Sequence, residues 1–239
     1  MLIDAKGLDF TALNELIKGS GGDCEIDNCL GQRFIADGLG GGEVRINGIP
    51  GNALGAYLNG AQITVNGNAQ DAVGDTMNGG KIIVHGSIGD TAGYAMRGGE
   101  IYVEKNAGYR AGIHMKEYRG KKPVIVIGGR TGSFLGEYQA GGLIIVLGRN
   151  TDGKPTVGNF PCTGMHGGKM VLRGSADGIK FPSQVTLKAA SDGDMAEIMP
   201  FLKKYCEYFN LDIDELTDEP FTVITPDSGK PYKQMYVAN

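Results

Sequence analysis

The sequence lacks the features of several large classes of protein. Lysine and arginine are scattered and the formal net charge is −4, which argues against a nucleic-acid-binding surface. The longest unbroken aliphatic run, LIIVL (143–147), is far shorter than the roughly 20 residues of a membrane-spanning helix. The N-terminal segment MLIDAKGLDF has no signal-peptide pattern. These absences favour a folded cytoplasmic protein.

Cysteine and histidine are scarce as well. The four cysteines are Cys24, Cys29, Cys162 and Cys206. Their spacing matches neither a disulfide framework nor a zinc or redox motif, so we expect reduced thiols. His114 and His166 with Cys162 lack a further ligand at a partnering interval, and His85 is expected on the surface. We therefore assign no metal site.

Glycine, in contrast, is abundant, at 41 of 239 residues, more than twice the usual ~7%. The segments GNAQDAVGDTMNGGKIIV (67–84) and GSIGDTAGYAMRGGEIYV (86–103) repeat one pattern, and Gly55, Gly74, Gly93 and Gly112 recur every 19 residues. Each unit has a glycine-rich bend, an apolar-x-apolar strand and a G-x-x-G-x-x-x-G return. In a later copy the return ends at Gly136.

This period predicts a solenoid. Nineteen residues are too few for a strand–helix–strand unit, which needs about 30. We count about seven units between Ala36 and Gly174. The fold class that follows is all-β: a single-stranded, right-handed parallel β-helix whose coils stack at ~4.8 Å into a rod of roughly 30 Å.

The repeat also assigns an interior. The strand pairs expected to face inward are Val44/Ile46, Ile63/Val65, Ile82/Val84, Ile101/Val103, Val124/Val126, Ile144/Val146 and Met170/Leu172. A second core column is expected at Leu39, Leu58, Met77, Met96, Met115 and Met165, with Gln139 as the exception. The corner glycines should have positive φ and leave no room for a Cβ between coils: Gly55, Gly74, Gly93, Gly112 and Gly136.

Three regions make up one expected structural domain. Residues 1–35 should form an N-terminal cap with a helix over 9–18, and residues 36–190 the β-helix. Residues 191–239 should form a second cap or docking element. They contain a helix with a Ser191–Asp194 capping box, a kink or restart at Pro200, and an extended docking tail over 220–237.

No residue pattern indicates catalysis. Asp71, Asp75 and Asp90 fall in corner segments, where aspartate favours turns through hydrogen bonds to its own backbone. The outward strand positions supply no carboxylate pair for acid–base work, and no phosphate-binding loop precedes a helix. We assign no catalytic or cofactor-binding residue, and keep a β-helix carbohydrate-active enzyme as a remote alternative.

The outward strand residues suggest an interface. They run Arg45, Thr64, Ile83, Tyr102, Ile125, Ile145 and Val171. The first two are polar and the rest are apolar, and a strand that is apolar on both faces is covered on both. We expect Ile83, Tyr102, Ile125, Ile145 and Val171 to be covered either by the C-terminal helix and tail or by another polypeptide.

Several segments resemble a known family. They are GIPGNALGAYLNGAQITVNGNAQDAVGDTMNGGKIIV (48–84), GEYQAGGLIIVLG (136–148) and GNFPCTGMHGG (158–168). They closely resemble the GXGXG domain, the β-helical C-terminal domain of the glutamate synthase large subunit, over roughly residues 29–233. The helix after the solenoid and the segment PFTVITPDSGKPYK also look like that domain's ending. The resemblance implies a structural brace without catalytic residues, between an amidotransferase domain and a synthase domain that carries FMN and an iron–sulfur cluster.

The resemblance implies a function in an assembly. We expect a non-catalytic subunit of a glutamate-synthase-like complex, with glutaminase-type amidotransferase and FMN-containing synthase polypeptides as partners. FMN and the iron–sulfur cluster are expected on those partners, and no cofactor on this chain. The alternative is the C-type subunit of a tungsten or molybdenum formylmethanofuran dehydrogenase, which shares the repeat. A homo-oligomer remains open.

Overall fold

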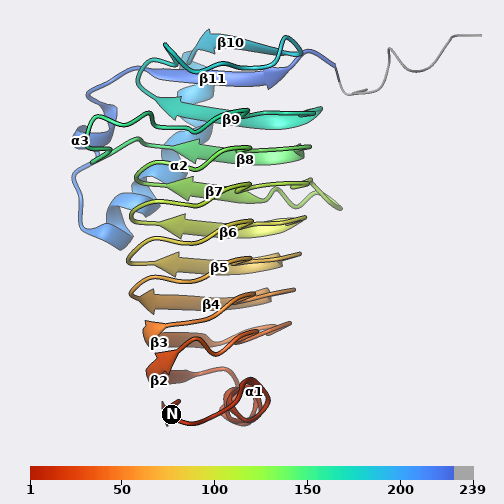
Figure 1. Ribbon diagram of the computed structural model, residues 1–239, viewed down its shortest axis with the longest axis vertical. Helices are drawn as coiled ribbons and strands as arrows, with labels where there is room; N and C mark the ends of the chain where they lie inside the picture. Colours follow the sequence, from red (N-terminus) through yellow and green to blue (C-terminus); the bar gives the residue numbers. More distant parts are fainter. Residues whose placement is uncertain (229–239) are drawn as a thin grey trace, which may run out of the picture.

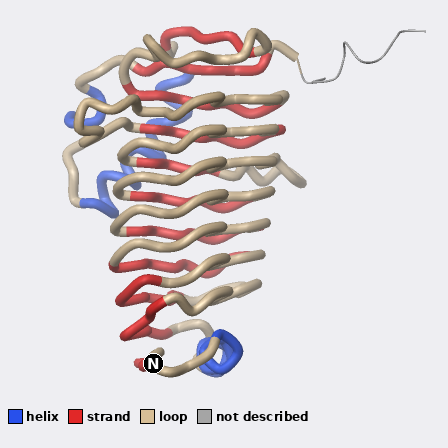
Figure 2. Tube along the Cα trace, in the orientation of Figure 1, coloured by secondary structure: helices blue, strands red, loops and turns tan. Residues whose placement is uncertain are grey.

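A stack of coils builds the protein, described for residues 1–228 by a computed structural model (Figure 1). Each coil contributes one strand, and the strands lie above one another along the long axis. Helices lie beside the N-terminal end and along one side of the upper half (Figure 2). The elements in chain order are β1 (Leu2–Asp4), α1 (Phe10–Gly19), β2 (Cys24–Leu30), β3 (Glu43–Ile49), β4 (Asn59–Asn66), β5 (Asn78–Val84), β6 (Gly98–Val103), β7 (Val124–Ile127), β8 (Ala140–Val146), β9 (Gly167–Arg173), β10 (Val185–Ala189), α2 (Asp192–Phe209), α3 (Asp214–Thr217) and β11 (Phe221–Pro226).

The strands form one sheet that follows the chain. β1 to β9 pair in parallel and in order, as a solenoid requires. The predicted parallel β-helix is confirmed, with about eight turns. The expected seven is one short because β2 lies within residues 1–35, which we assigned to a cap. Cys24 and Ile26 nevertheless stack directly on Val44 and Ile46 of β3.

Two columns of strand side chains fill the interior. One contains Val44, Ile63, Ile82, Ile101, Ile125, Ile144 and Met170; the other contains Ile46, Val65, Val84, Val103, Ile127, Val146 and Leu172. Every member is at most 1% exposed. Burying one such side chain stabilises the fold by roughly 1.5–3 kcal/mol relative to leaving it exposed, so these columns are the main source of stability.

The predicted inward pair of the fifth repeat is wrong by one residue. Ile125 and Ile127 face inward in place of Val124 and Val126, because Ile125 stacks between Ile101 and Ile144. The strand VIVI is apolar at every position, so its own pattern does not distinguish the two faces. The neighbouring coils set the register.

The methionine column is confirmed as core. Leu58, Met77, Met96, Met115 and Met165 are at most 1% exposed, whereas Leu39, near the N-terminal end of the column, is only partly buried. Gln139 takes the same place one coil below Met165 and is fully buried. Its Nε2 donates to the carbonyl oxygens of Gly141 and Gly142, each at 3.2 Å. An amide is therefore held inside the coil by backbone acceptors.

Each coil closes through a segment in which residues of positive φ alternate with residues of negative φ. In one coil Ala53, Gly55 and Tyr57 have φ of 62°, 64° and 57°. Their N–H groups point alternately to the two neighbouring coils: Ala53 and Tyr57 donate to Asp71 and Asp75 of the next coil, and Gly55 to Ile35 of the previous one. The closing segment is thus hydrogen-bonded to the coils on both sides through its residues of positive φ.

The middle position of this segment holds the five predicted corner glycines. Their φ lies between 64° and 71°, as expected. A Cβ on Gly93 would lie 2.5 Å from Ile125 Cδ1, a side chain of the next coil's inward column. Ala36 and Cys162 occupy the same position near the two ends of the stack, each with φ of 58°. Only the inner coils require glycine here.

A docked helix lies at the N-terminal end of the stack, within one residue of the helix predicted over 9–18. Helix α1 begins after Asp9, whose side chain accepts the N–H of Ala12, and buries Leu13 and Ile17. Asn14 fixes α1 to the closing segment that follows β2. Its Nδ2 donates to the carbonyl of Phe34, and its Oδ1 accepts the N–H of Ala36.

The C-terminal end is closed by strands. β11 inserts between β9 and β10 and pairs antiparallel with both. Part of the predicted tail therefore becomes a sheet strand, and residues 229–237 lie outside the described residues. Helix α2 is continuous across Pro200 and lies against the side of the stack, so it is a docking element, not an end cap.

A substitution at the corner tests the closing geometry. We expect Gly93→Ala to lower the free energy of unfolding by about 3 kcal/mol, because it combines a left-handed alanine with a collision against Ile125. Gly120→Ala is the control, since Gly120 has φ of 76° and no described atom within 4 Å of the added Cβ. It should cost about 1 kcal/mol. Equal losses in chemical denaturation would contradict the role of the inward column.

Candidate assembly surface

The outer face of the sheet is apolar over its upper half. Ile83, Tyr102, Val126, Ile145 and Val171 form one outward column, since each pairs in register with the next. All five are at most 2% exposed. Four are among our predicted interface residues. The fifth prediction, Ile125, is wrong, because the one-residue shift in β7 places Ile125 in the interior and Val126 outside.

Helix α2 covers this outer column. Ile198, Leu202, Tyr205 and Cys206 of α2 are buried in the same cluster as the outward strand residues. Of the two coverings considered, the chain's own C-terminal helix is the one present. Arg45 and Thr64, in the same outward column of the lower half, lie outside this cluster.

Hydrogen bonds fix the helix at its exit end. The Tyr205 hydroxyl donates to the carbonyl of Glu104 at 2.9 Å, and the Tyr208 ring meets the Tyr102 ring edge-on at 5.0 Å. Burial, followed by the nearby Glu100 carboxylate, raises the pKa of the Tyr102 phenol, so Tyr102 remains a neutral donor to Glu100.

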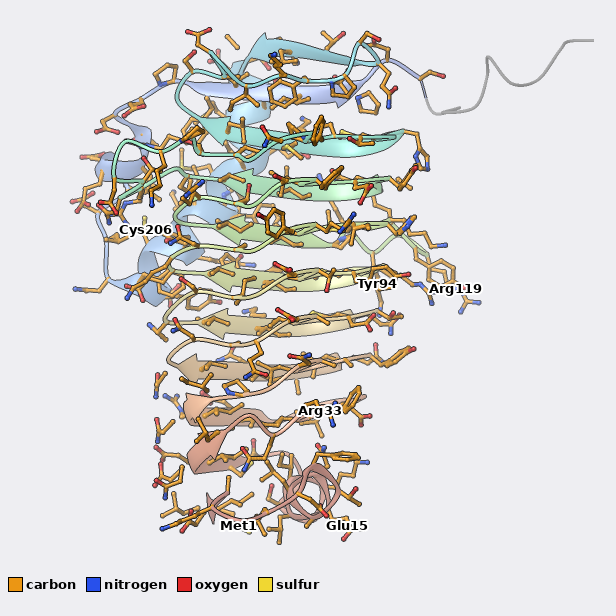
Figure 3. The ribbon with its side chains drawn as sticks, viewed as in Figure 1. Met1, Glu15, Arg33, Tyr94, Arg119 and Cys206 are labelled. Carbon is orange, nitrogen blue, oxygen red and sulfur yellow. The ribbon has the colours of Figure 1, made fainter. Side chains whose placement is uncertain are left out.

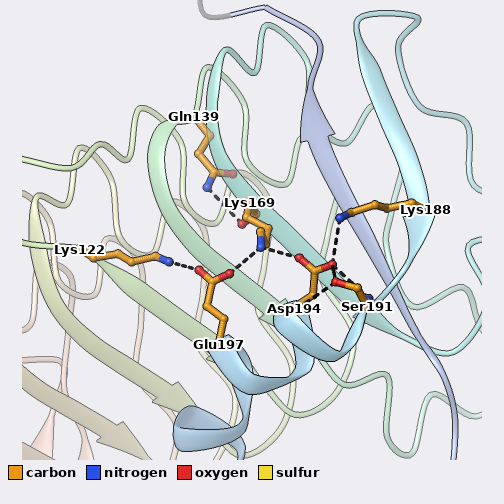
Figure 4. Close-up of polar contacts among 7 residues, drawn as sticks. All are labelled: Lys122, Gln139, Lys169, Lys188, Ser191, Asp194 and Glu197. Carbon is orange, nitrogen blue, oxygen red and sulfur yellow. Dashed lines mark hydrogen bonds and ion pairs between the residues drawn. The ribbon is translucent and has the colours of Figure 1, made fainter.

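Charged side chains fix the entry end of α2 (Figure 4). Lys169 of β9 lies between two helix carboxylates, with its Nζ 2.7 Å from Asp194 Oδ1 and 2.5 Å from Glu197 Oε2. Lys122 pairs with Glu197, and Lys188 of β10 pairs with Asp194 at 2.9 Å. The predicted Ser191–Asp194 capping box is also present. Asp194 is thus shared between the helix cap and two strands.

These contacts shift the pKa values of Asp194 and Lys169. The hydrogen bond from Lys169, followed by those from Ser191 and Lys188, holds the pKa of Asp194 well below its usual range. Burial disfavours the charged form of Lys169, but its bonds to Asp194 and Glu197 outweigh this effect and raise its pKa. Both partners therefore stay charged across neutral pH.

The three histidines have separate roles. His114 is exposed, stacks on Tyr138 at 5.2 Å between ring centres and meets Tyr94 edge-on at 5.9 Å. His166 Nδ1 lies 2.9 Å from the carbonyl of Gly164. His85 lies beside the Phe209 ring of α2 at 5.2 Å.

Cys162 is an interior residue. It is fully buried beside Met170, and burial raises the pKa of its thiol to about 12. Within residues 1–228, no group of three or more histidine, cysteine or acidic side chains is placed to hold a metal ion.

Two of the three corner aspartates, Asp71 and Asp90, bond between coils, whereas Asp75 Oδ1 accepts the hydroxyl of the adjacent Thr76 at 2.8 Å. Asp71 Oδ1 accepts the N–H of Asp90 at 2.9 Å, and Asp90 Oδ1 accepts the N–H of Tyr109 at 2.8 Å. We expected such bonds within the same turn, but the acceptor serves the next coil. The two carboxylates therefore satisfy backbone donors of the stack.

Exposed aromatic side chains gather along the closing segments. The residues and their exposed fractions are Phe34 (41%), Tyr57 (57%), Tyr94 (40%), Tyr109 (53%) and Phe160 (61%). None of these residues is among our predicted interface residues, which came only from the outward positions of the strands. The repeat offered a signal, since these aromatics fall within the same part of successive units.

Truncation on the outer face tests whether α2 is its cover. We expect Ile145→Ala to lower the free energy of unfolding by about 3 kcal/mol, the cost of a cavity in a packed cluster. Thr64→Ala, at the equivalent outward position of the uncovered half, should change it by less than about 0.5 kcal/mol. Similar losses in the two variants, measured by urea denaturation, would contradict this assignment.

The ion pairs of Asp194 predict that the stability of the fold depends on pH. We expect Asp194→Asn to lower the free energy of unfolding by about 2 kcal/mol at pH 7. The pKa of Asp194 is lower in the folded protein than in the unfolded chain, where it is about 3.9. Its contribution to the free energy of unfolding is therefore fully present above about pH 4 and is lost as the pH falls towards the folded pKa. The difference between wild type and variant should therefore shrink below about pH 4.

Asp192→Asn is the matched control, in the same first helical turn but exposed. It should change the stability by less than about 0.5 kcal/mol. Melting temperatures measured across the pH range would count against the assignment if both variants behaved alike.

Two properties of the described residues complete this picture. No helix within residues 1–228 is long and apolar enough to cross a membrane. The four cysteines Cys24, Cys29, Cys162 and Cys206 are all free and buried.

Similar proteins match nearly the whole chain. An uncharacterized protein of Methanocaldococcus jannaschii is 42% identical over 250 residues, which cover 99% of this chain and 96% of that protein. A chain of the formyltransferase/hydrolase complex FhcABCD of Methylorubrum extorquens, solved with methylofuran, has the same fold at a TM-score of 0.62 and 18% identity. That match covers 94% of this chain and 90% of the other. The model of the GXGXG motif matches residues 23–221, so the chain belongs to the GXGXG motif family.

Proposed function

We propose that this chain is a non-catalytic, structural subunit of a multi-subunit complex of the formylmethanofuran dehydrogenase or formyltransferase/hydrolase type. It would supply a rigid rod against which catalytic polypeptides assemble. In this proposal the chain carries no cofactor, and the tungsten or molybdenum centre belongs to a partner. The complex works in the cytoplasm, in keeping with four free, buried cysteines.

One observation carries this choice among the functions considered. The structural neighbour is a chain of a complex, and the match covers 90% of that chain and 94% of this one. The shared fold thus extends over nearly the whole of both chains. A subunit built around a solenoid is suited to holding other polypeptides, because its stacked coils present an extended surface.

The surface gives a second argument. The deep apolar face of the sheet is covered by α2, so partners must bind at other surfaces, which include the lower outer face and the aromatic closing segments. The polar groups with the strongest potential for chemistry are used in the fold: Asp71 and Asp90 by backbone donors, Asp194 and Glu197 by lysines. These roles favour a brace over a reaction centre.

A glutamate-synthase-like complex is the second candidate. The observation in its favour is the ending of the chain, where a helix and the segment PFTVITPDSGKPYK follow the solenoid as in that family's domain. In that case the partners are a glutaminase-type amidotransferase and a synthase polypeptide with FMN and an iron–sulfur cluster.

Purification of the native assembly tests the proposal. The chain is tagged in its own host, purified under mild conditions and analysed by mass spectrometry and metal analysis. We expect stoichiometric formyltransferase/hydrolase-type polypeptides and, in a dehydrogenase, a pterin-bound metal. Glutaminase-like and flavin-containing polypeptides would instead support the second candidate. A chain that elutes alone, or turns over substrate alone, would contradict both.

A further inference from the structure

A short basic projection leaves the stack between Met115 and β7. Residues 116–122, KEYRGKK, interrupt the 19-residue spacing and form what we call the basic finger. Tyr118 and Lys121 exchange backbone hydrogen bonds of 3.2 and 3.0 Å, and Gly120 provides the turn with φ of 76°. Figure 3 shows Arg119 projecting at the edge of the molecule, away from the coils.

The cations here lack acidic partners in the part of the chain that the structure describes. Within residues 1–228, the cationic cluster makes no ion pair: Arg97, Lys116, Arg119 and Lys121. Elsewhere, cations such as Lys169 and Arg173 pair with two carboxylates each. Unpaired like charges gathered at this edge of the stack repel one another, which destabilises the free chain.

An aromatic ring organises the cluster. The guanidinium carbons of Arg97 and Arg119 lie 5.9 and 5.1 Å from the centre of the Tyr118 ring. Arg97 Nε is buried and has no hydrogen-bond partner among the described residues. Cation–π contacts with the ring therefore hold both guanidinium groups beside one another.

The nearby carboxylates do not neutralise the cluster. Glu100 binds Lys204 Nζ at 2.7 Å and accepts from Tyr102, and Glu197 binds Lys122 and Lys169. Glu117, on the finger itself, accepts the N–H of Gly142 and keeps its negative charge, but residues 116–122 carry four cations against this one carboxylate. A local positive surface thus remains on a chain whose net charge is −4.

A cleft continues from the base of the finger. It has a volume of about 420 Å³, and its charged lining is Lys81, Glu100, Lys121 and Lys122. The Lys121 stem crosses the sheet edge so closely that a Cβ on Gly98 would lie 3.0 Å from its Cβ, and its Nζ donates to the carbonyl of Asn78. An extended segment lying in this cleft would meet cations on the finger and on the sheet.

We propose that the basic finger and this cleft bind an acidic segment of a partner polypeptide. The inference rests on the proposed function for the existence of a partner, and adds the chemistry of its contact. Charge complementarity favours carboxylates, and tyrosine flanked by arginines is the composition of protein interface hot spots. Nucleic acid is a poorer fit, because the acidic remainder of the chain would repel a long polyanion.

A binding assay with a defined probe tests the inference on the full chain. The probe is a fluorescent peptide of about ten alternating aspartates and glutamates, and a neutral serine–glutamine peptide is its reference. We expect the acidic peptide to bind at least tenfold more tightly than the neutral one, and to weaken several-fold from about 50 to about 300 mM salt. Equal binding of the two peptides would overturn the inference.

Matched variants locate the site. Arg97→Gln, Arg119→Gln and Lys121→Gln together should weaken binding of the acidic peptide at least tenfold, with a melting curve that verifies folding. Lys6→Gln, Lys18→Gln and Lys203→Gln together change the net charge equally at exposed residues elsewhere and should change binding less than twofold. Equal losses, or tighter binding of single-stranded DNA of the same charge, would overturn the inference.

The same triple variants separate this inference from the proposed function. If the tagged native chain purifies with its partners and the finger variant retains them at high salt as wild type does, the docking inference fails and the function stands. If the chain purifies alone yet binds the acidic peptide through the finger, the proposed function fails and the site stands.

Discussion

Stacking in register is the constraint on which the structure depends. Each coil must place its inward side chains directly above those of the coil before, because the apolar columns are continuous from β3 to β9. It must also turn its closing segment so that backbone N–H groups reach the neighbours on both sides. Glycines with positive φ satisfy the two demands together at the inner corners, where a Cβ would enter the isoleucine column. The interior therefore dictates the backbone, and the repeat in the sequence follows from it.

The outer face of the sheet is subject to a different constraint. A sheet that is apolar outside must be covered, and in the upper half α2 provides the cover with its own apolar side. The helix is positioned at one end by hydroxyl contacts and at the other by lysines from the strands and the segment before β7. The lower half has polar outward residues and needs no such cover. The chain divides into a sealed half and a half whose strand face meets solvent.

Much of the fold could be predicted from the sequence, since a 19-residue repeat with alternating strands admits few architectures. The errors arose where the local pattern carries no information. VIVI has no alternation, so the register of Ile125 depends on Ile101 and Ile144 from other coils. β2 joins the stack without the glycine return that marks later coils. The ion-pair group around Lys169 unites residues 122, 169, 188, 194 and 197, and only the folded chain brings them together. The basic finger was visible as an insertion, but its unpaired charges became evident only with all neighbours in place.

The insertion of β11 between β9 and β10 has a consequence for biosynthesis. The coils up to β9 can stack in the order in which they leave the ribosome, each on the one before it. Among the described strands, β10 pairs only with β11, which is about thirty residues further along the chain and is separated from it by α2. The last described strand to emerge is therefore the one that joins β10 to the stack, and a polypeptide halted before that point leaves β9 with an unpaired edge capable of joining other chains.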